Sequence, residues 1–386
     1  MHDQGSNARI SELDGLRGLA IVFVLLWHFV GALSGDDIVR SLTIWGRTGV
    51  DFFFVLSGFL IIGILVDERD SKHLLKVFYW RRFMRIYPPY AMLIALYWLC
   101  YVWVGESPAF NTNAGAVVQL LAQVTFTWNW LMAVTDSAVA RGFSVTWSVA
   151  IEEWFYLIAP WVMIATPRRY LVPLLLAIGA TSILARGAAH LLFGANHSLA
   201  PYVLPPFRLD GFCAGGLLAL AMRNKLAKQA LLKHASKAAK CALAFVISTP
   251  LTIAVIQNDL DRQMYLWGHT YLTVGYAIVL LWAIQSAGEK RTKWLRVKAL
   301  TEAGRYSYTL YLFHPLFISL CFTLAGKQRE IVASWQDVLL AVSAFVVSLL
   351  FSIVFYWAVE KRALALGKRM AYRDAAFSGE RQATQS

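Results

Sequence analysis

Long apolar runs constrain this chain more than any other feature of its sequence. Eleven runs are long enough to cross a lipid bilayer as α-helices, at residues 14–34, 47–66, 86–104, 115–133, 147–165, 170–193, 206–222, 241–257, 265–286, 305–325 and 337–359. A helix of about 20 apolar residues matches the hydrocarbon thickness of a bilayer and satisfies its own backbone hydrogen bonds there. Because 58% of the 386 residues are apolar and only 15% are charged, a soluble core could not hide the apolar surface. We therefore predict an all-α, polytopic transmembrane helix bundle.

The positive charges between the runs predict how many of them cross. Basic stretches occupy 69–85, 223–240 and 290–298, with smaller groups at Arg168–Arg169 and after Glu360. Lys and Arg concentrate in cytoplasmic loops, and placing all these stretches there requires one run not to cross. The weakest run is 115–133, which polar residues such as Gln119 and Gln123 interrupt. We predict ten crossings with both termini cytoplasmic, and eleven crossings are the alternative.

The chain reads as one domain. We expect residues 1–366 to form the transmembrane domain and the basic residues 367–386 to form a disordered cytoplasmic tail. The first apolar run lacks a small-residue cleavage site, which favours a retained helix over a signal peptide. The net charge of +13 fits cytoplasmic loops, and without a recognisable binding module we expect no nucleic-acid partner. The four cysteines have no metal-type spacing, so we expect neither a disulfide framework nor a metal site.

Ionisable residues inside the first run predict a functional site. A charge within a membrane span is costly unless it is buried and paired, and Asp14, Arg17 and His28 all lie in this run. Arg17 and His28 are eleven residues apart, which places them on one helix face about 16 Å from each other. A lone histidine on an apolar face is more often structural. The arginine on the same face favours a functional role for His28.

A second group of charges lies just before the third run, in RRFMRIYPPY. Arg82 and Arg85 are three residues apart and share a helical face. Two guanidinium groups side by side suit a phosphate-rich ligand that arrives from the cytoplasm. The alternative is ordinary positive-inside anchoring.

Two adjacent carboxylates, Glu152 and Glu153, stand inside the apolar run WSVAIEEWFY. They point about 100° apart, so one can face the site, and a buried carboxyl group suits proton transfer. Other polar residues near the ends or middles of runs are also candidates, each with a structural alternative such as helix capping or close packing. They are Asp51, Ser148, Arg208 and His314.

Six stretches, in order, resemble the acyltransferase-3 family of bacterial membrane O-acyltransferases. They are LDGLRGLAIVFVLLWHF, GVDFFFVLSGFLI, RRFMRIYPPY, WSVAIEEWFYLIAP, FRLDGFCAGG and SYTLYLFHPLF, and the resemblance runs from about residue 11 to 360. One departure is Glu360-Lys361-Arg362, where the family often has an acidic residue followed by Arg-Pro. The other is that we find no appended extracytoplasmic hydrolase-like domain, so we expect any such activity to come from another protein or to be unnecessary.

The resemblance implies transfer of an acyl group, usually acetyl, from cytoplasmic acyl-CoA to a hydroxyl of a saccharide or glycolipid, in the bacterial inner membrane. It also implies that the intramembrane histidine and the arginine motif are needed for activity. On this interpretation Arg17, Arg82 and Arg85 contact the donor's phosphates. His28 acts as general base or as a transient acyl carrier, and Glu152 or Glu153 orients its imidazole or holds sugar hydroxyls. The residues assigned to substrate binding are Asp14, Asp51, Ser148, Arg208 and His314.

The residues alone leave two other functions open. A proton-coupled transporter or flippase of a glycolipid or small anion would also use buried His, Glu and Arg. An enzyme with a phosphorylated donor would usually need an acidic metal-binding cluster, and the runs hold few acidic residues. Succinyl or longer acyl groups, and acceptors from lipopolysaccharide to peptidoglycan, lipid-linked intermediates or small glycosides, also remain open.

Overall fold

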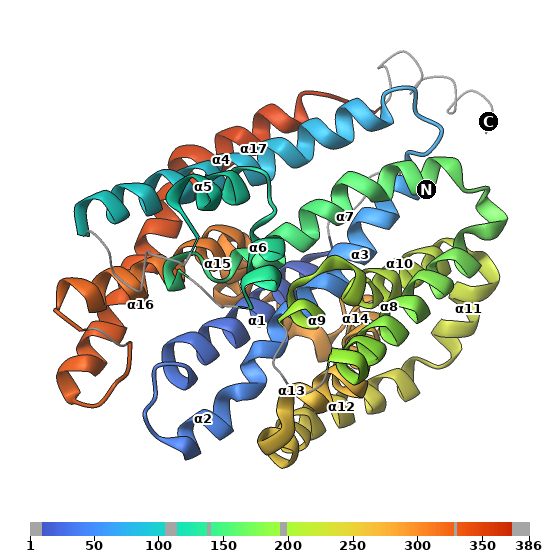
Figure 1. Ribbon diagram of the computed structural model, residues 1–386. Coiled ribbons are helices and arrows are strands. Elements are labelled where there is room, and N and C mark those ends of the chain that lie inside the picture. Colours follow the sequence, from blue (N-terminus) through green and yellow to red (C-terminus); the bar gives the residue numbers. More distant parts are fainter. Residues whose placement is uncertain (1–9, 105–113, 137–139, 194–198, 328–329, 373–386) are drawn as a thin grey trace.

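The computed structural model describes residues 10–104, 114–136, 140–193, 199–327 and 330–372 (Figure 1). These residues form helices and no strand. Nine helical segments among them are long and apolar enough to cross a membrane: Ser11–Gly31, Asp37–Asp67, Leu74–Val104, Arg141–Ala165, Arg168–Leu192, Ala235–Ile256, Leu260–Gln285, Lys298–Leu324 and Trp335–Lys368. The predicted all-α polytopic bundle is confirmed.

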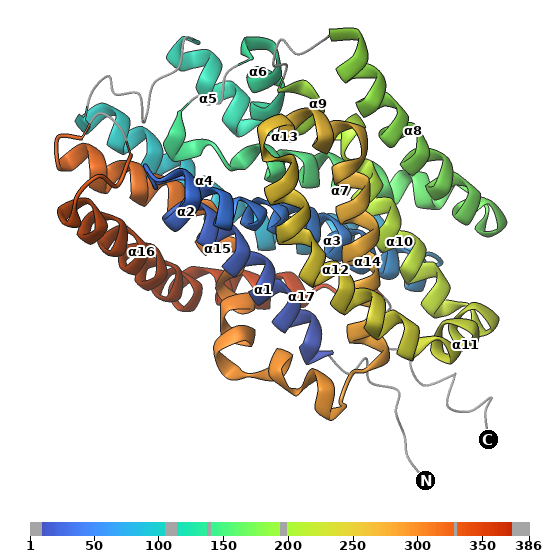
Figure 2. The ribbon, with the colours of Figure 1, turned by 90° about the horizontal axis from the view of Figure 1, so that it is seen from below.

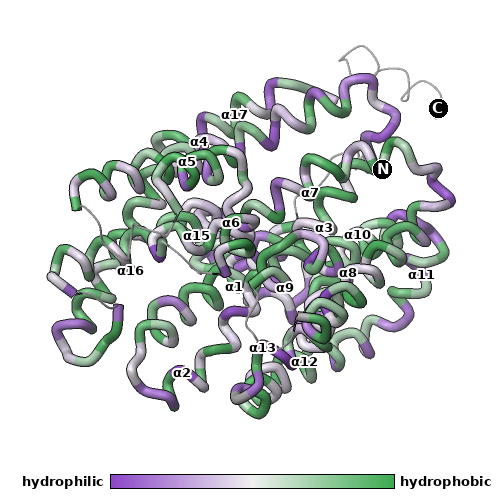
Figure 3. Tube along the Cα trace, viewed as in Figure 1, coloured by the Kyte–Doolittle hydropathy of each residue, from purple (hydrophilic) through white to green (hydrophobic). Residues whose placement is uncertain are grey.

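The spans are built from long helices, several of which are extended by short turns at their ends. The long helices are α1 (Ser11–Leu26), α3 (Gly49–Asp67), α4 (Leu74–Val104), α7 (Thr146–Ala165), α8 (Leu171–Phe193), α10 (Leu209–Arg223), α12 (Ala235–Ile256), α14 (His269–Gln285), α15 (Lys298–Leu324) and α16 (Trp335–Phe355). The shorter ones are α2 (Asp37–Thr43), α5 (Ala116–Val124), α6 (Trp128–Thr135), α9 (Ala200–Val203), α11 (Lys225–Lys233), α13 (Leu260–Gln263) and α17 (Lys361–Lys368). Figure 3 shows hydrophobic residues along most of these helices and hydrophilic residues gathered along α11 and at the turns.

Helix α10 corresponds to the predicted crossing at 206–222, which is not among these nine segments. Its 15 residues span about 22 Å, which is shorter than a full bilayer crossing. It lies against α3 (Figure 2), and the two helices approach closely because glycines of each meet the backbone of the other. A Cβ atom on Gly58 would collide with the Phe212 backbone, and one on Gly215 would collide with the carbonyl of Val55. α10 therefore lies inside the bundle, covered by its neighbours.

Hydrogen bonds gather the basic connections on one face, which we call the inner face. Arg168 pairs with Asp70 at 2.8 Å, and Arg223 pairs with Asp67 at 2.5 Å. The hydroxyl of Ser71 donates to the carbonyl oxygen of Tyr372, beyond α17. At the start of α1, Glu12 accepts from the Gly288 N–H at 2.8 Å, in the connection before α15. The nine candidate spans and the shorter α10 together make ten segments, and the number of crossings and the side on which each terminus lies stay predictions. That the inner face is cytoplasmic also stays a prediction.

The opposite face, which we call the outer face, holds the run that we expected not to cross. Helices α5 and α6 are only 9 and 8 residues long. The helical conformation is interrupted between them at Phe126, whose φ is +55°. The interrupting glutamines are buried and bonded: Trp98 donates to Gln123 Oε1 at 2.8 Å. Residues 115–133 thus fold back on the outer face.

Most of the predicted tail lies outside the described residues, which end at Tyr372. The first residues of that stretch, Gly367 and Lys368, complete α17, which lies alongside α4 (Figure 1).

Candidate active site

Two cavities lie on either side of a shared wall inside the bundle. The arginine cavity, about 70 Å³, is lined by residues of α1, α3, α4, α7 and α15 that include Arg17, Ser57, Arg82, Arg85, Glu152 and Tyr156. The histidine cavity, about 390 Å³, is lined by His28, Arg47, Trp147, Tyr202, Asp261 and Tyr265 among others. Val50 and Tyr311 line both cavities.

The arginine cavity brings together the three arginines that the sequence singled out. None of them forms an ion pair with a described carboxylate. Arg82 lies over the rings of Phe78 and Tyr156, at 5.7 Å from each centroid, and its buried Nε has no hydrogen-bond partner among the described residues. Uncompensated guanidinium groups in a partly buried site favour an anion.

The neighbouring Arg81 has a different role from Arg82 and Arg85, although all three arginines belong to the stretch RRFMRIYPPY. Its guanidinium donates to the carbonyl oxygen of Met370 at 2.8 Å and lies over the ring of Tyr372. Arg81 therefore joins α4 to the segment after α17 and does not line the arginine cavity.

The two adjacent carboxylates also separate. Glu152 accepts hydrogen bonds from Ser57 at 3.0 Å and from Tyr156 at 3.1 Å, and lines the arginine cavity. Glu153 does not line it, and its buried Oε1 has no hydrogen-bond partner among the described residues. Glu152 thus places one negative charge beside three positive ones.

His28 lies in a π-helical turn, Trp27–Gly31, that continues α1. Its Nδ1 is 2.8 Å from the carbonyl oxygen of Val24, so Nδ1 carries the proton and Nε2 keeps a free lone pair. The expectation that Glu152 or Glu153 orients this imidazole is wrong for this structure, because a backbone carbonyl does so. The carbonyl oxygen four residues earlier in the helix is within reach of the imidazole, as it also is for His314 in α15.

His314 from α15 is the immediate neighbour of His28. The two ring centroids are 4.7 Å apart, and the rings meet edge to face. His314 is fully buried, its Nδ1 lies 3.1 Å from the carbonyl oxygen of Leu310, and its Nε2 has no hydrogen-bond partner among the described residues. His314 therefore packs against the ring of His28. It lines neither the arginine cavity nor the histidine cavity, so its predicted contact with a substrate is not seen.

At the wall between the cavities, a hydrogen bond between two hydroxyl groups joins α7 to α15. Tyr311 Oη lies 2.6 Å from Ser148 Oγ and donates to the carbonyl oxygen of Val145 at 3.1 Å. Ser148, predicted to bind substrate, lines the arginine cavity next to this wall. A group that travels from the arginines to His28 must pass Tyr311.

Comparison with known proteins decides the family. A family model described as an acyltransferase domain matches residues 10–357. The chain belongs to the acyltransferase-3 family. It is 27% identical over 323 residues to the O-acetyltransferase OatA of Staphylococcus aureus (strain NCTC 8325 / PS 47), covering 79% of this chain and 50% of that protein. It is 24% identical over 354 residues to the peptidoglycan O-acetyltransferase OatA of Listeria monocytogenes, covering 89% of this chain and 54% of that protein. The chain thus spans about half the length of these curated relatives, and no solved structure matches it.

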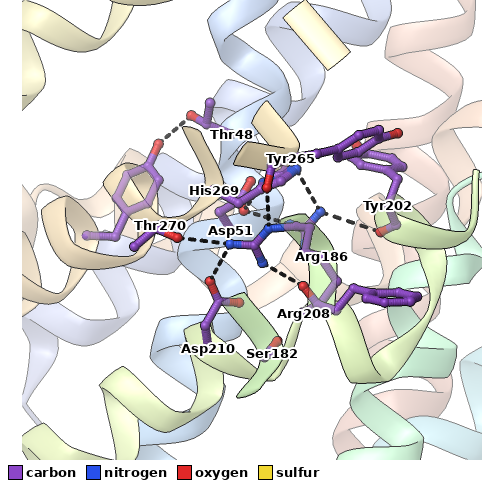
Figure 4. A network of polar contacts seen from close by, with 12 residues as sticks. Thr48, Asp51, Ser182, Arg186, Tyr202, Arg208, Asp210, Tyr265, His269 and Thr270 are labelled. Carbon is purple, nitrogen blue, oxygen red and sulfur yellow. Dashed lines mark hydrogen bonds and ion pairs between the residues drawn. The ribbon is translucent and has the colours of Figure 1, made fainter. Parts of the chain in front are cut away.

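In this acyltransferase-3 protein, two of the residues assigned to substrate binding, Asp51 and Arg208, belong to a buried network (Figure 4), and Asp51 also lines a small cavity. Arg208 donates to Asp51 Oδ1 at 2.6 Å, and His269 Nδ1 lies 3.0 Å from the same oxygen. Arg208 also lies 3.2 Å from His269 Nε2, so that nitrogen accepts and Nδ1 donates to Asp51. With both ring nitrogens engaged, His269 holds a fixed neutral form.

Arg186 and Asp210 extend this network. Arg186 donates to Asp210 Oδ2 at 3.1 Å and to Thr270 Oγ1 at 3.0 Å, and its side chain is fully buried. Sequence reasoning missed Arg186 and His269. The signal for Arg186 was present, since an arginine in the middle of the 170–193 run is costly unless paired. His269 carried no such signal, because it stands at the start of a run.

Asp14 lies one turn before Arg17, close enough for its charge to act on that guanidinium. It lines neither cavity, so its predicted contact with an acceptor is not seen. Among the described residues, no three His, Cys, Asp or Glu side chains gather as a metal site.

Proposed function

We propose that this protein is a membrane O-acetyltransferase of the bacterial inner membrane. It takes acetyl from acetyl-CoA, bound from the inner face, and transfers it to a hydroxyl of a cell-envelope saccharide at the outer face. The observation that carries this proposal is the pair of cavities that share Val50 and Tyr311, with three arginines on one side and His28 on the other.

We assign the acetyl-CoA site to the arginine cavity because of its positive charge. Coenzyme A carries phosphate groups at one end and its thioester at the end of a long arm. Arg17, Arg82 and Arg85 would hold the phosphates through charge-assisted hydrogen bonds. The arm then extends along the cavity toward Tyr311, with the thioester at the wall.

The acceptor side follows from the free Nε2 of His28. As the acceptor oxygen attacks the thioester carbonyl, Nε2 takes the hydroxyl proton as general base. The tetrahedral intermediate then releases the thiolate of CoA, which takes the proton back from the imidazolium. The products are an acetyl ester and CoA thiol, with no net proton change and no metal ion in the route.

The acceptor class is supported by the relatives. The Listeria monocytogenes relative is named a peptidoglycan O-acetyltransferase. A saccharide outside the membrane would meet His28 from the outer face, which bears the histidine cavity's exposed residue Asp261.

The test is acetyl-CoA consumption by the purified protein in nanodiscs, scored as CoA release with and without a mixed cell-envelope saccharide fraction. We expect wild type to bind acetyl-CoA and to release CoA in the presence of saccharide. Absence of both binding and turnover with acetyl-, succinyl- and longer acyl-CoA would contradict the proposal. Trapping of radiolabelled acetyl on the protein, lost in His28→Ala, would replace the general-base route by an acyl-histidine route.

A further inference from the structure

We propose that the outer part of the histidine cavity is a carbohydrate-stacking site, in which a pyranose ring of the acceptor packs on Trp147 and Tyr202. The inference rests on the proposed function, which supplies the acceptor, and it adds where and through which chemistry that acceptor binds.

The wall of the histidine cavity is aromatic. Five aromatic side chains line it, namely Trp27, Trp147, Tyr202, Tyr265 and Tyr311. The rings of Trp147 and Tyr202 meet at a centroid distance of 4.5 Å and an angle of 44°. Pyranose rings have C–H faces that pack on aromatic surfaces and a rim of hydroxyl groups that needs polar partners. Cavities with aromatic walls and few polar groups suit such an amphipathic ligand.

Two charged residues provide the polar partners in the same cavity. The Arg47 guanidinium lies between the rings of Trp27 and Tyr202, at 5.8 and 5.5 Å from their centroids. Asp261 contributes an acceptor from the connection on the outer face. A donor fork and a carboxylate can together bind neighbouring hydroxyls, or a hydroxyl and an acetamido group, on one sugar ring.

The buried network of Figure 4 explains how this wall is held in place. Arg208 lies over the rings of Tyr202 and Trp147, at 5.3 and 5.9 Å, and donates to the Tyr202 carbonyl oxygen at 3.4 Å. Arg186 Nε donates to the carbonyl oxygen of Tyr265 at 3.3 Å. Three of the five aromatic wall residues, Trp147, Tyr202 and Tyr265, therefore contact a buried arginine.

The charges of these two arginines are balanced behind the wall, by Asp51 and Asp210. Removing one partner of such a buried ion pair would leave the other uncompensated, which is strongly unfavourable. Asp51, Arg208, Arg186 and Asp210 are thus positioning residues, and the wall residues are the ones that touch the sugar. Binding sites need such supporting contacts to keep their geometry.

The first experiment measures sugar binding without acetyl-CoA, so that it is independent of catalysis. Tryptophan fluorescence of the protein in nanodiscs is titrated with chitotetraose, and with sorbitol as a polyol that lacks a ring. We expect wild type to bind chitotetraose more tightly than sorbitol, and Tyr202→Ala to lose about tenfold in chitotetraose affinity. Tyr170→Ala, an exposed tyrosine at the inner face, serves as control and should bind as wild type does. Equal binding of both probes, no binding of chitotetraose by wild type, or an unaffected Tyr202→Ala variant would overturn the proposal.

The second experiment tests the positioning role through Arg208→Lys, which keeps the charge but loses the planar fork. We expect the KM for the saccharide acceptor to rise about tenfold with the Kd for acetyl-CoA unchanged. Arg168→Lys, in the exposed inner-face pair with Asp70, is the matched control. If Arg208→Lys changes the two constants equally, its role is structural only, and the positioning claim fails.

The two proposals fail separately. Chitotetraose binding that depends on Tyr202 in a protein without acetyl-CoA turnover would refute the acyltransferase function and leave the carbohydrate site. Turnover with acetyl-CoA but no dependence on Tyr202 would do the reverse.

Discussion

The arginine cavity and the histidine cavity handle charge in opposite ways. In the arginine cavity, three guanidinium groups have no ion pair among the described residues, and Glu152 is the carboxylate that lines the cavity beside them. Next to the histidine cavity, Arg186 and Arg208 are each paired with an aspartate and lie behind an aromatic wall. An uncompensated charge marks where a ligand's opposite charge belongs, whereas a compensated one holds other side chains in place.

The cavities also differ in size, in a way that matches this division. The arginine cavity is about 70 Å³ and the histidine cavity about 390 Å³. A narrow charged passage suits the extended arm of a thioester, and a wide aromatic chamber suits a sugar ring. The predictions below test this division between donor side and acceptor side.

The largest effect is expected at His28. Replacing it with alanine removes the only group that we assign to proton transfer, so we expect turnover to fall by about 10³-fold. Acetyl-CoA binding, measured by calorimetry, should stay as in wild type because His28 does not line the arginine cavity. His234→Ala, at an exposed turn between α11 and α12, is the control. Equal losses of binding and turnover in His28→Ala would remove the division.

The arginine pair should show the complementary effect. We expect Arg82→Gln/Arg85→Gln to weaken acetyl-CoA binding about 100-fold, because two charge-assisted contacts are lost. Chitotetraose binding should not change. Arg81→Gln is a control from the same stretch, since Arg81 bonds to the Met370 carbonyl and lies outside the cavity. If Arg81→Gln weakens acetyl-CoA binding as much as the double variant, the stretch acts only through its overall charge.

Glu152 tests the arginine cavity through the negative charge that it places beside the three arginines. Glu152→Gln removes a negative charge beside the arginines, while the amide can still accept a hydrogen bond from the hydroxyl of Ser57 or Tyr156 and donate one to the other. We therefore expect acetyl-CoA to bind about threefold more tightly. Glu289→Gln, in an exposed pair with Arg291 that does not line the cavity, is the matched control and should leave the affinity unchanged. Weaker binding in Glu152→Gln would mean that this carboxylate orients an arginine.

The smallest effect is expected at Glu330, next to His28 in a second outer cavity. Burial raises the pKa of Glu330 above its ordinary value, although Ser319 and Arg141 oppose the shift. The folded state therefore binds more protons than the unfolded state in the window above pH 4.5, and stability falls as pH rises through that window. We expect Glu330→Gln to have a higher midpoint temperature of unfolding than wild type at pH 8, and to match wild type near pH 4. A constant difference across this range would contradict the assignment.

Much of the fold followed from the sequence because membrane crossing leaves a strong local signal. The lengths of the apolar runs gave the spans, and Gln119 and Gln123 correctly marked the run that folds back. The same reasoning singled out Arg17, Arg82, Arg85 and His28, because a charged or polar group in or beside an apolar run is costly unless it is paired or binds a ligand. It did not show that Asp51 and Arg208 are each other's partners at 2.6 Å.

The sequence by itself determined what is local: the helices, the polar residues inside them and the resemblance to the family. The tertiary structure decided which of those residues meet. It separated Glu152 from Glu153, gave His28 a backbone carbonyl in place of a carboxylate, and placed His314 at 4.7 Å from it. It also joined Arg186 and His269 to a network that no spacing predicted. The physical reason is that pairing in a bundle depends on how α3, α8, α10 and α14 pack, and that packing is set by glycine contacts between helices distant in the chain.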